Sequence, residues 1–259
     1  MRAWFNRLRR RLVRALAFRS VFGERSQGRW LPNTRISPSA CLEHEERLVL
    51  HDHVYVGPFV LIEASGGVTL HEGVQVTTHV SIVTHSSHRS MRLLGRKYVG
   101  WAGERPGWIG GAVEIGAYSF IGPHALIEAS GGVTLHEGVQ VTSHASIVTH
   151  SSHRSMRLLG REYVRWAGER PGWIGGAVEI GAYSFVGPHA LIEAGTRLGR
   201  GTLVCAGSVV RGDHPEFAVL EGRPARVVGD TRRADARLIE RHPELRALRA
   251  QWAGPDEPA

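Results

Sequence analysis

Paired histidines in a repeated segment are the residues of this sequence best suited to acid–base chemistry. The letters Ser-Ile-Val-Thr-His-Ser-Ser-His begin at Ser81 and begin again at Ser146, so that His85 and His150 occupy equivalent positions. A neutral imidazole accepts a proton at physiological pH, which makes a histidine of this kind a candidate general base. His88 and His153 are the alternative candidates in the two copies.

The two histidine segments belong to a tandem duplication. Residues 61–125 and 126–190 align at an offset of 65 residues with only five mismatches. A match this close over a block of this length indicates a recent duplication, so both copies should form the same structural unit.

An aliphatic residue returns every six positions through most of the chain. The series includes Leu50, Val56 and Ile62, and it continues through both copies as far as Val210. Neither the helical period of 3.6 nor the strand period of 2 gives this spacing, whereas a prism with one short strand on each of three faces does. We therefore predict an all-β solenoid of six coils around a narrow aliphatic core, with a partial coil before them around Ile36.

Two long excursions interrupt the six-residue series, roughly from Val83 to Ala112 and from Val148 to Ala177. Each has the paired histidines near its start and two tryptophans near its end. Loops of this length are usually functional or disordered, so we expect the histidine chemistry here. The glutamates Glu72, Glu114, Glu137 and Glu179 are interpreted as solvated turn residues rather than as partners that orient a base.

The ends of the chain differ from the solenoid, which gives three predicted parts: residues 1–30, 31–228 and 229–259. In residues 1–22, Trp4, Phe5, Leu8, Leu12, Ala15 and Leu16 fall on one helical stripe among arginines. This amphipathic helix is too charged to span a membrane, and it lies either on an anionic membrane surface or on the body of the protein. The segment from Thr231 to Trp252 is predicted to form a helix that covers the last coil, interrupted near Pro243.

Composition excludes several other classes. The net charge of +8 comes almost wholly from arginine, with Lys97 as the single lysine, and we attribute this bias to coding composition rather than to a nucleic-acid surface. Cys41 and Cys205 lie far apart in the sequence, and we find no secretory signal peptide pattern. We expect a cytoplasmic protein, with peripheral contact to the inner face of the membrane as an option.

The chain closes with a run that contains Ala206, Gly207 and Ser208, and then Gly-Arg-Pro-Ala-Arg-Val from Gly222 to Val227. The hexads, the inserted histidine loop and this closing run together resemble the hexapeptide-repeat O-acetyltransferases of the maltose, galactoside and nodulation type. The resemblance extends over about residues 36 to 228. The sequence departs from the family in having two histidine loops and in lacking the Asn-rich turns before them.

The resemblance implies a left-handed parallel β-helix, a homotrimer, and acetyl-CoA bound between neighbouring subunits. It also implies that a loop histidine acts as general base on a saccharide or glycan hydroxyl, which attacks the thioester directly in a ternary complex without a covalent acyl-enzyme and without a metal. On the same basis Ala206, Gly207, Ser208, Arg211 and Arg226 are the expected CoA-binding residues. Because only the second loop lies at the ordinary family distance from them, we predict His150 as the base, with His85 as vestigial or as a second acceptor contact.

Two alternatives come from other classes. The γ-class carbonic anhydrases share the prism and bind zinc through three histidines, for which His79, His85, His88 and His124 are the candidates. A non-catalytic β-helix scaffold is the other alternative. The sequence leaves open the identity of the acceptor and the length of the acyl chain.

Overall fold

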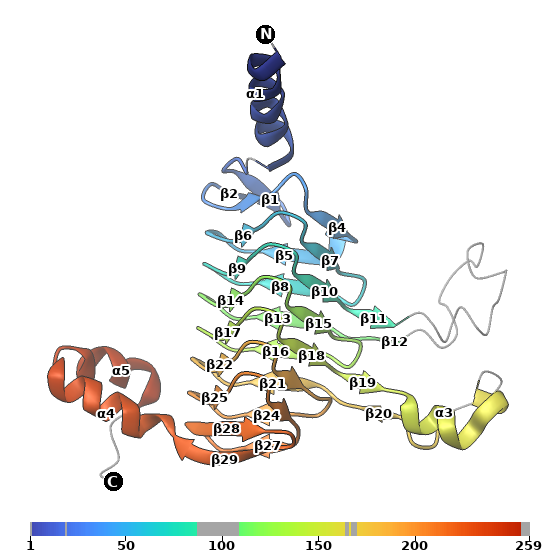
Figure 1. Cartoon of the computed structure of the whole chain (residues 1–259), viewed down its shortest axis with the longest axis vertical. Coiled ribbons are helices and arrows are strands. Elements are labelled where there is room, and N and C mark those ends of the chain that lie inside the picture. The colour runs from blue at the N-terminus through green and yellow to red at the C-terminus, as the bar shows by residue number, and fades with distance from the viewer. Residues whose placement is uncertain (1, 19, 87–108, 164–165, 167–169, 255–259) are drawn as a thin grey trace.

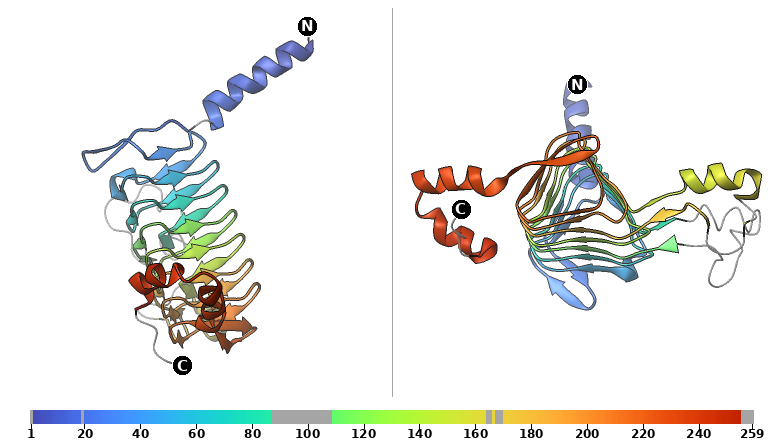
Figure 2. Two further views of the ribbon diagram at one scale, coloured as in Figure 1. Left: turned by 90° about the vertical axis from the view of Figure 1, so that its left-hand side faces the viewer. Right: turned by 90° about the horizontal axis from the view of Figure 1, so that it is seen from below.

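Three sheets of short parallel strands wind into a three-sided prism (Figures 1 and 2). The structure is a computed structural model that describes residues 2–18, 20–86, 109–163, 166 and 170–254. Each coil of the chain adds one strand to every sheet, and neighbouring coils pair in parallel register. The predicted all-β solenoid is therefore confirmed as a parallel β-helix.

Both histidine loops leave the prism after strands of one sheet, which we call the loop-side sheet. It consists of β4 (Cys41–Glu43), β7 (Leu61–Glu63), β10 (Ser81–Val83), β15 (Leu126–Glu128), β18 (Ser146–Val148), β23 (Leu191–Ile192) and β26 (Val209–Val210). The second sheet consists of β5 (Leu48–Leu50), β8 (Val68–Leu70), β13 (Val113–Ile115), β16 (Val133–Leu135), β21 (Val178–Ile180), β24 (Arg197–Leu198) and β27 (Asp213–His214). The third sheet consists of β3 (Arg35–Ile36), β6 (Tyr55–Val56), β9 (Gln75–Val76), β14 (Phe120–Ile121), β17 (Gln140–Val141), β22 (Phe185–Val186), β25 (Leu203–Val204), β28 (Ala218–Gly222) and β29 (Ala225–Asp230).

The core is a stack of aliphatic side chains along the prism axis. On the loop-side sheet, Ile62, Ile82 and Ile127 lie in register on successive coils, and all three are fully buried. Burial of one such side chain contributes about 1.5–3 kcal/mol relative to exposure. The six-residue series arises because one inward position per strand must be filled on each face.

The stack extends beyond the C-terminal end of the predicted series. At the N-terminal end, β3 and β4 are the partial coil expected around Ile36, and β5 ends at Leu50, the first residue of the series. β27 and β28 follow Val210, where we expected the series to end. Leu220 of β28 is fully buried and pairs in register with Val204. The six-residue pattern missed this last turn because the residue of β27 that lies beside Leu198 is His214, which is not aliphatic and comes only four residues after Val210.

The C-terminal segment forms α4 (Thr231–Arg241) and α5 (Leu245–Ala253), with a break near Pro243. The prediction that this segment covers the last coil is wrong. The helices lie beside the prism (Figure 2), where Trp252 stacks on Tyr183 with ring centroids 4.6 Å apart. The last coil is instead closed by β29, which pairs antiparallel with β28.

At the other end, a hairpin of β1 (Glu24–Ser26) and β2 (Arg29–Leu31) precedes the first coil. Before it, α1 (Arg2–Val13) continues into the π-helical turn Arg14–Phe18 and projects away from the prism (Figure 2). α1 buries no residue, so the interpretation that this helix packs on the body is wrong for residues 2–13. Among the described helices, none is long and apolar enough to cross a membrane.

Register between coils also produces a ladder of stacked rings at one corner. The imidazoles of His79, His124, His144 and His189 stack in turn, with centroids 4.8 to 4.9 Å apart, and Phe59 lies against His79 at the N-terminal end. All five residues have a positive φ near 60°, because the corner between two faces needs a left-handed residue in every coil.

Another corner uses glycine for the same conformation. Gly138 has φ +67°, and a Cβ at this position would lie 2.7 Å from the ring of Tyr183 in the next coil. Tyr183, at the equivalent place in the next coil, has φ +56°, so this conformation does not itself require glycine. Glycine is needed at position 138 for the close approach of the tyrosine ring.

Truncation of one stacked core residue tests the energetics of the prism. Leu135 is 1% exposed, and Leu135→Ala should lower the free energy of unfolding by about 3 kcal/mol because a cavity opens in a rigid stack. Leu158→Ala, at a leucine that is 65% exposed, should change it by less than about 0.5 kcal/mol. Urea unfolding followed by circular dichroism measures both; equal losses in the two variants would contradict the proposed core.

Candidate active site

Both histidine loops leave the prism directly after strands of the loop-side sheet. The chain departs after β10 and re-enters at β13, and in the second copy it departs after β18 and re-enters at β21, close to the predicted loop bounds. Each loop starts and ends as a two-stranded antiparallel ribbon. The ribbons pair β11 (His85–Ser86) with β12 (Ile109–Gly110), and β19 (His150–Ser151) with β20 (Ile174–Gly175).

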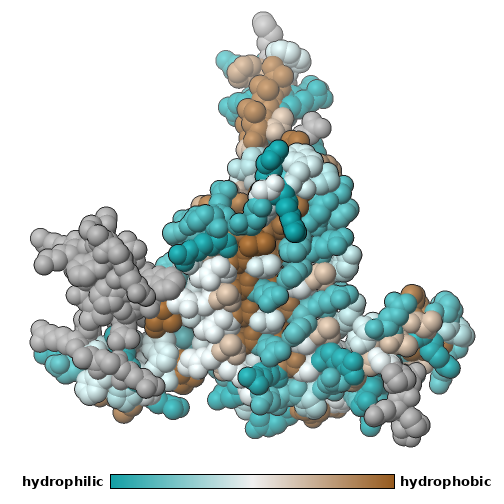
Figure 3. All heavy atoms as spheres, turned by 180° about the vertical axis from the view of Figure 1, so that it is seen from behind, coloured by the Kyte–Doolittle hydropathy of each residue, from teal (hydrophilic) through white to brown (hydrophobic). Residues whose placement is uncertain are grey.

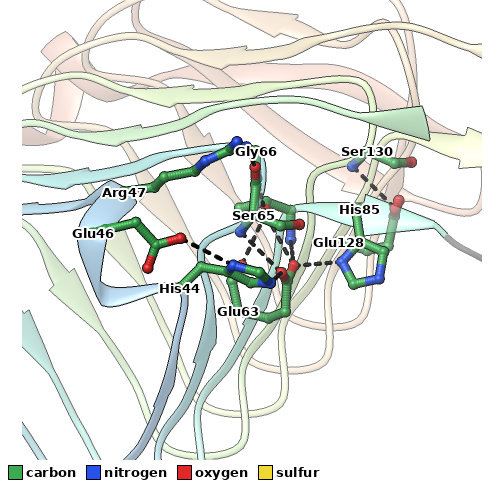
Figure 4. A network of polar contacts seen from close by, with 10 residues as sticks. His44, Glu46, Arg47, Glu63, Ser65, Gly66, His85, Glu128 and Ser130 are labelled. Atoms are coloured by element: carbon green, nitrogen blue, oxygen red, sulfur yellow. Dashed lines mark hydrogen bonds and ion pairs between the residues drawn. The ribbon is translucent and has the colours of Figure 1, made fainter. Parts of the chain in front are cut away.

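In the first copy, His85 is paired with a buried carboxylate of the preceding coil. Its Nδ1 lies 2.6 Å from Oε2 of Glu63, whose side chain is only 5% exposed (Figure 4). The Glu63 carboxylate also accepts hydrogen bonds from the backbone N–H groups of Ser65, at 2.9 Å, and Thr84, at 3.2 Å. Several donors thus converge on one carboxylate, as a buried charge requires.

The second copy contains the same pair. Nδ1 of His150 lies 3.0 Å from Oε2 of Glu128, and each side chain is 17% exposed. The backbone N–H groups of Ser130 and Thr149 donate to Glu128 at 3.0 and 3.1 Å. The Ser130 hydroxyl oxygen also lies 2.8 Å from His150 Nδ1, a contact that the equivalent Ser65 hydroxyl does not make within the described part of the first copy.

Both carboxylates are held in the ionised form. Burial raises the pKa of Glu63, but the hydrogen bonds from Ser65 and His85 outweigh burial and lower that pKa from 4.5 to about 2. Burial likewise raises the pKa of Glu128, and the bonds from His150 and Ser130 lower it to about 2. Hydrogen bonds to the charged form of a carboxyl group favour ionisation, which explains the direction of both shifts.

An ionised carboxylate fixes the tautomer of the histidine beside it. Because Glu63 and Glu128 only accept hydrogen bonds when ionised, the Nδ1 atoms of His85 and His150 must donate to them. In the neutral imidazole the proton-accepting lone pair is then on Nε2. This arrangement orients a general base and stabilises the imidazolium that forms when it takes a proton.

Around His150, the second loop adds an aromatic wall. The Trp173 ring stacks on the imidazole with centroids 5.0 Å apart and planes 10° from parallel. The loop also contains α3 (His153–Leu159), a 3-10 turn (Gly160–Tyr163), and the guanidinium of Arg170 over the buried Tyr163 ring at 4.0 Å. His153, the alternative base, bonds to Ser151 at 2.6 Å rather than to a carboxylate, which favours His150. His88 lies outside the described residues.

The two pairs lie on one face, with a single strand between their glutamates. β10 separates β7 from β15, and strands in a sheet are about 4.8 Å apart, so the pairs are displaced by roughly 10 Å along the prism. A third Leu-Ile-Glu-Ala sequence follows at Leu191, but no loop leaves beside it. There Glu193 forms an ion pair with Arg211, Nε to Oε2 at 3.1 Å.

The expected CoA-binding residues lie on the last coils. Gly207 forms the left-handed corner residue with φ +69°, while Ser208 is buried and its Oγ accepts from the N–H of Gly222 at 3.2 Å. Ala206 and Arg226 are exposed. Among the described residues, no hydrogen bond or ion pair joins any of these, or Arg211, to His150 or His85. The chain therefore brings each candidate base together with a glutamate, but its described residues do not bring either histidine into contact with the expected donor site.

The other titratable candidates lie elsewhere. Glu114 and Glu179 contact His71 and His136, and Glu137 accepts from the Tyr183 hydroxyl at 2.5 Å, so none of these contacts orients a loop histidine. Within the described part of the chain, no three histidine, cysteine or acidic side chains gather where they could hold one metal ion. The zinc alternative thus lacks a ligand set among these residues, since His79 and His124 belong to the stacked ladder.

Sequence reasoning missed Glu63 and Glu128. The signal was present, because Leu-Ile-Glu-Ala-Ser stands at the same distance before each paired-histidine segment. One coil occupies about twenty residues between paired strands, so the glutamate at the end of one strand lies beside the chain that leaves one coil later.

Comparisons with known proteins give likenesses in structure only. No protein-family model matches the chain, and no curated protein matches it. A variant of AntD, an N-acyltransferase from Bacillus cereus in complex with dTDP and coenzyme A, is 16% identical over 82% of this chain and 88% of its own, with a TM-score of 0.47. The polySia-specific acetyltransferase NeuO is 16% identical over 83% of this chain and 91% of its own, with a TM-score of 0.49. The hexapeptide-repeat acetyltransferase VCA0836 from Vibrio cholerae is 23% identical over 46% of this chain and 62% of its own, with a TM-score of 0.40.

The lowered pKa of the two glutamates predicts an acid-sensitive fold. A carboxyl group whose pKa falls on folding contributes stability above its unfolded pKa and loses it as the pH falls through the folded pKa. A shift from 4.5 to about 2 corresponds to about 3 kcal/mol for each glutamate at neutral pH, lost between about pH 5 and pH 2. Glu63→Gln should therefore be less stable than wild type at pH 7, and this difference should shrink towards pH 2.

Urea unfolding at a series of pH values measures this difference. Glu72→Gln, at an exposed glutamate, is the matched control and should follow the wild-type curve at every pH. A Glu63→Gln curve that runs parallel to wild type from pH 7 to pH 2 would contradict the linkage.

Proposed function

We propose that this protein is an acyl-CoA-dependent O-acyltransferase that transfers an acetyl group from acetyl-CoA to a saccharide hydroxyl. The observation that carries the proposal is the His150–Glu128 pair, a histidine with a fixed tautomer at the start of a loop that leaves a parallel β-helix. The sequence resemblance of the hexads, the histidine loop and the closing Gly-Arg-Pro-Ala-Arg-Val run supports the same reaction class.

In the proposed reaction, Nε2 of His150 takes the proton of the acceptor hydroxyl. The oxygen attacks the thioester carbonyl of acetyl-CoA, the C–O bond forms as the C–S bond breaks, and the proton then passes to the leaving thiolate of CoA. Glu128 keeps Nδ1 protonated and stabilises the transient imidazolium. The flat ring of Trp173 restricts the imidazole to one plane, which limits the directions from which an acceptor can approach.

The finer features implied by the resemblance are part of the proposal. They are left-handed winding, a homotrimer, and a CoA groove that includes Ala206, Gly207, Ser208, Arg211 and Arg226. These residues lie on later coils than the base, which agrees with a groove completed by a neighbouring subunit. An apolar strip along the prism (Figure 3) offers a surface for such a neighbour.

Single-site variants of the two bases test the reaction and the choice of copy. His150→Ala should lower the rate of CoA release from acetyl-CoA in the presence of a saccharide acceptor by roughly 10²- to 10⁴-fold, because the general base is lost. His85→Ala should retain most of the activity. Loss of activity only in His85→Ala would overturn the assignment of the copy, and no turnover of wild type with any hydroxyl or amino sugar would overturn the proposed function.

Replacement of Glu128 shows whether this glutamate acts by positioning the His150 imidazole or by binding acetyl-CoA. Glu128→Gln should lower kcat about ten- to a hundredfold with little change in the KM for acetyl-CoA, because the amide neither holds the tautomer nor stabilises the imidazolium. Glu63→Gln is the matched variant in the other copy, where the glutamate also pairs with a histidine, and should leave kcat nearly unchanged. A rise in KM alone for Glu128→Gln would show that Glu128 does not act through the base.

A further inference from the structure

We propose that α1 and the turn that follows it form a docking surface for an anionic lipid bilayer. The segment Arg2–Phe18 presents two chemically different faces. Trp4, Phe5, Leu12 and Leu16 fall on one side of the helix and are between 53% and 76% exposed. The space-filling view shows an apolar stripe with hydrophilic flanks along this segment (Figure 3).

Arginine occupies the rest of this segment. Its six arginines are Arg2, Arg7, Arg9, Arg10, Arg11 and Arg14, and the first acidic residue of the chain is Glu24. Each arginine near an anionic membrane surface contributes about 1 kcal/mol, and long arginine side chains reach the headgroups while apolar side chains enter the acyl boundary. The charge and the apolar stripe thus fit one partner, a bilayer with negative headgroups.

The placement of the helix leaves this surface accessible. No residue of α1 is buried, and the helix points away from the prism beyond its first coil (Figures 1 and 2). The segment is attached to the prism at its C-terminal end, where Phe18 packs edge-on against Phe59 with ring centroids 5.4 Å apart. Just after the segment, the Arg35 guanidinium lies over the Phe22 ring at 5.0 Å. The base of the segment is anchored, while its amphipathic part extends free of the body.

A second copy of the chain fits this surface less well. The segment has no acidic residue with which to pair the arginines of a second helix, so that helices packed side by side would bring like charges together. Its apolar stripe also spans about a third of the helix circumference and includes two large aromatic rings, which suits an interface with lipid better than a narrow helix–helix seam.

Vesicle sedimentation of the full chain tests the proposal without any need for catalysis. Wild type should sediment with vesicles in which about a third of the lipid is phosphatidylglycerol, far less with phosphatidylcholine alone, and less as salt approaches about 1 M. The variant with Arg9→Gln, Arg10→Gln and Arg11→Gln should bind the anionic vesicles roughly a hundredfold more weakly. Replacement of the two aromatic residues, Trp4→Ser with Phe5→Ser, should also weaken binding.

A charge-matched variant serves as the control. Arg233→Gln, Arg237→Gln and Arg246→Gln remove the same number of charges from exposed positions of α4 and α5, and this variant should bind like wild type. Equal weakening in the two triple variants would overturn the proposal, because binding would then follow net charge alone. Absence of wild-type binding to anionic vesicles would also overturn it.

Sedimentation velocity without lipid tests whether the apolar stripe binds a second copy of the chain instead of lipid. If Trp4→Ser with Phe5→Ser lowers the assembly mass and leaves vesicle binding unchanged, the stripe is a contact between chains and the proposal is wrong. An unchanged mass together with weaker vesicle binding supports the lipid surface. Neither vesicle binding nor assembly mass depends on acetyl transfer, so the membrane proposal and the transferase proposal are tested separately.

Discussion

Parallel register between successive coils is the constraint on which the rest of this molecule depends. Because the parallel strands of the prism pair with their equivalents one coil away, each of their side chains lies directly beside the residue at the same place in the next coil. Inward positions are then aliphatic along most of the prism, with His214 of β27 as an exception, and corner positions repeat a left-handed conformation. The histidine ladder and the pairing of Gly138 with Tyr183 follow from the same rule applied to the outside of the prism.

Register also explains why a duplication of this size is tolerated. The distance from Leu61 to Leu126 corresponds to two whole coils with one loop, so the strands of the second copy fall in line with those of the first. A duplication of part of a coil would shift the inward positions onto other faces and expose the core. The duplicated segment includes β7, β10 and the loop, so the glutamate and the histidine were copied together. The His85–Glu63 pair of the first copy therefore recurs as the His150–Glu128 pair two coils further along.

The sequence predicted what depends on periodicity and missed what depends on neighbouring coils. The aliphatic series predicted the prism, its core and the bounds of both loops, since these require only the spacing of residues along the chain. It failed at β27, where the residue beside Leu198 is His214, and at the C-terminal helices, whose place is set by contact of Trp252 with a ring on another coil. The glutamate partners of the candidate bases were missed for a related reason. Glu63 and His85 are adjacent only once the length of a coil has been taken into account.

The two His–Glu pairs are nearly equivalent in local geometry, so what separates them must lie outside the pairs. The first pair is nearer to α1, and the second is nearer to the coils that hold Ala206–Ser208, with roughly 10 Å between the pairs. A glycan acceptor can extend over such a distance, because only one of its hydroxyls has to reach the base. The thioester carbon has no such freedom, since it must come within about 3–3.5 Å of the attacking oxygen while that oxygen stays in hydrogen-bond reach of the imidazole. In the proposed reaction the position of the donor therefore selects the base, and the proposed donor site at the C-terminal coils favours His150 even if the acceptor is presented from a membrane at the opposite end of the prism.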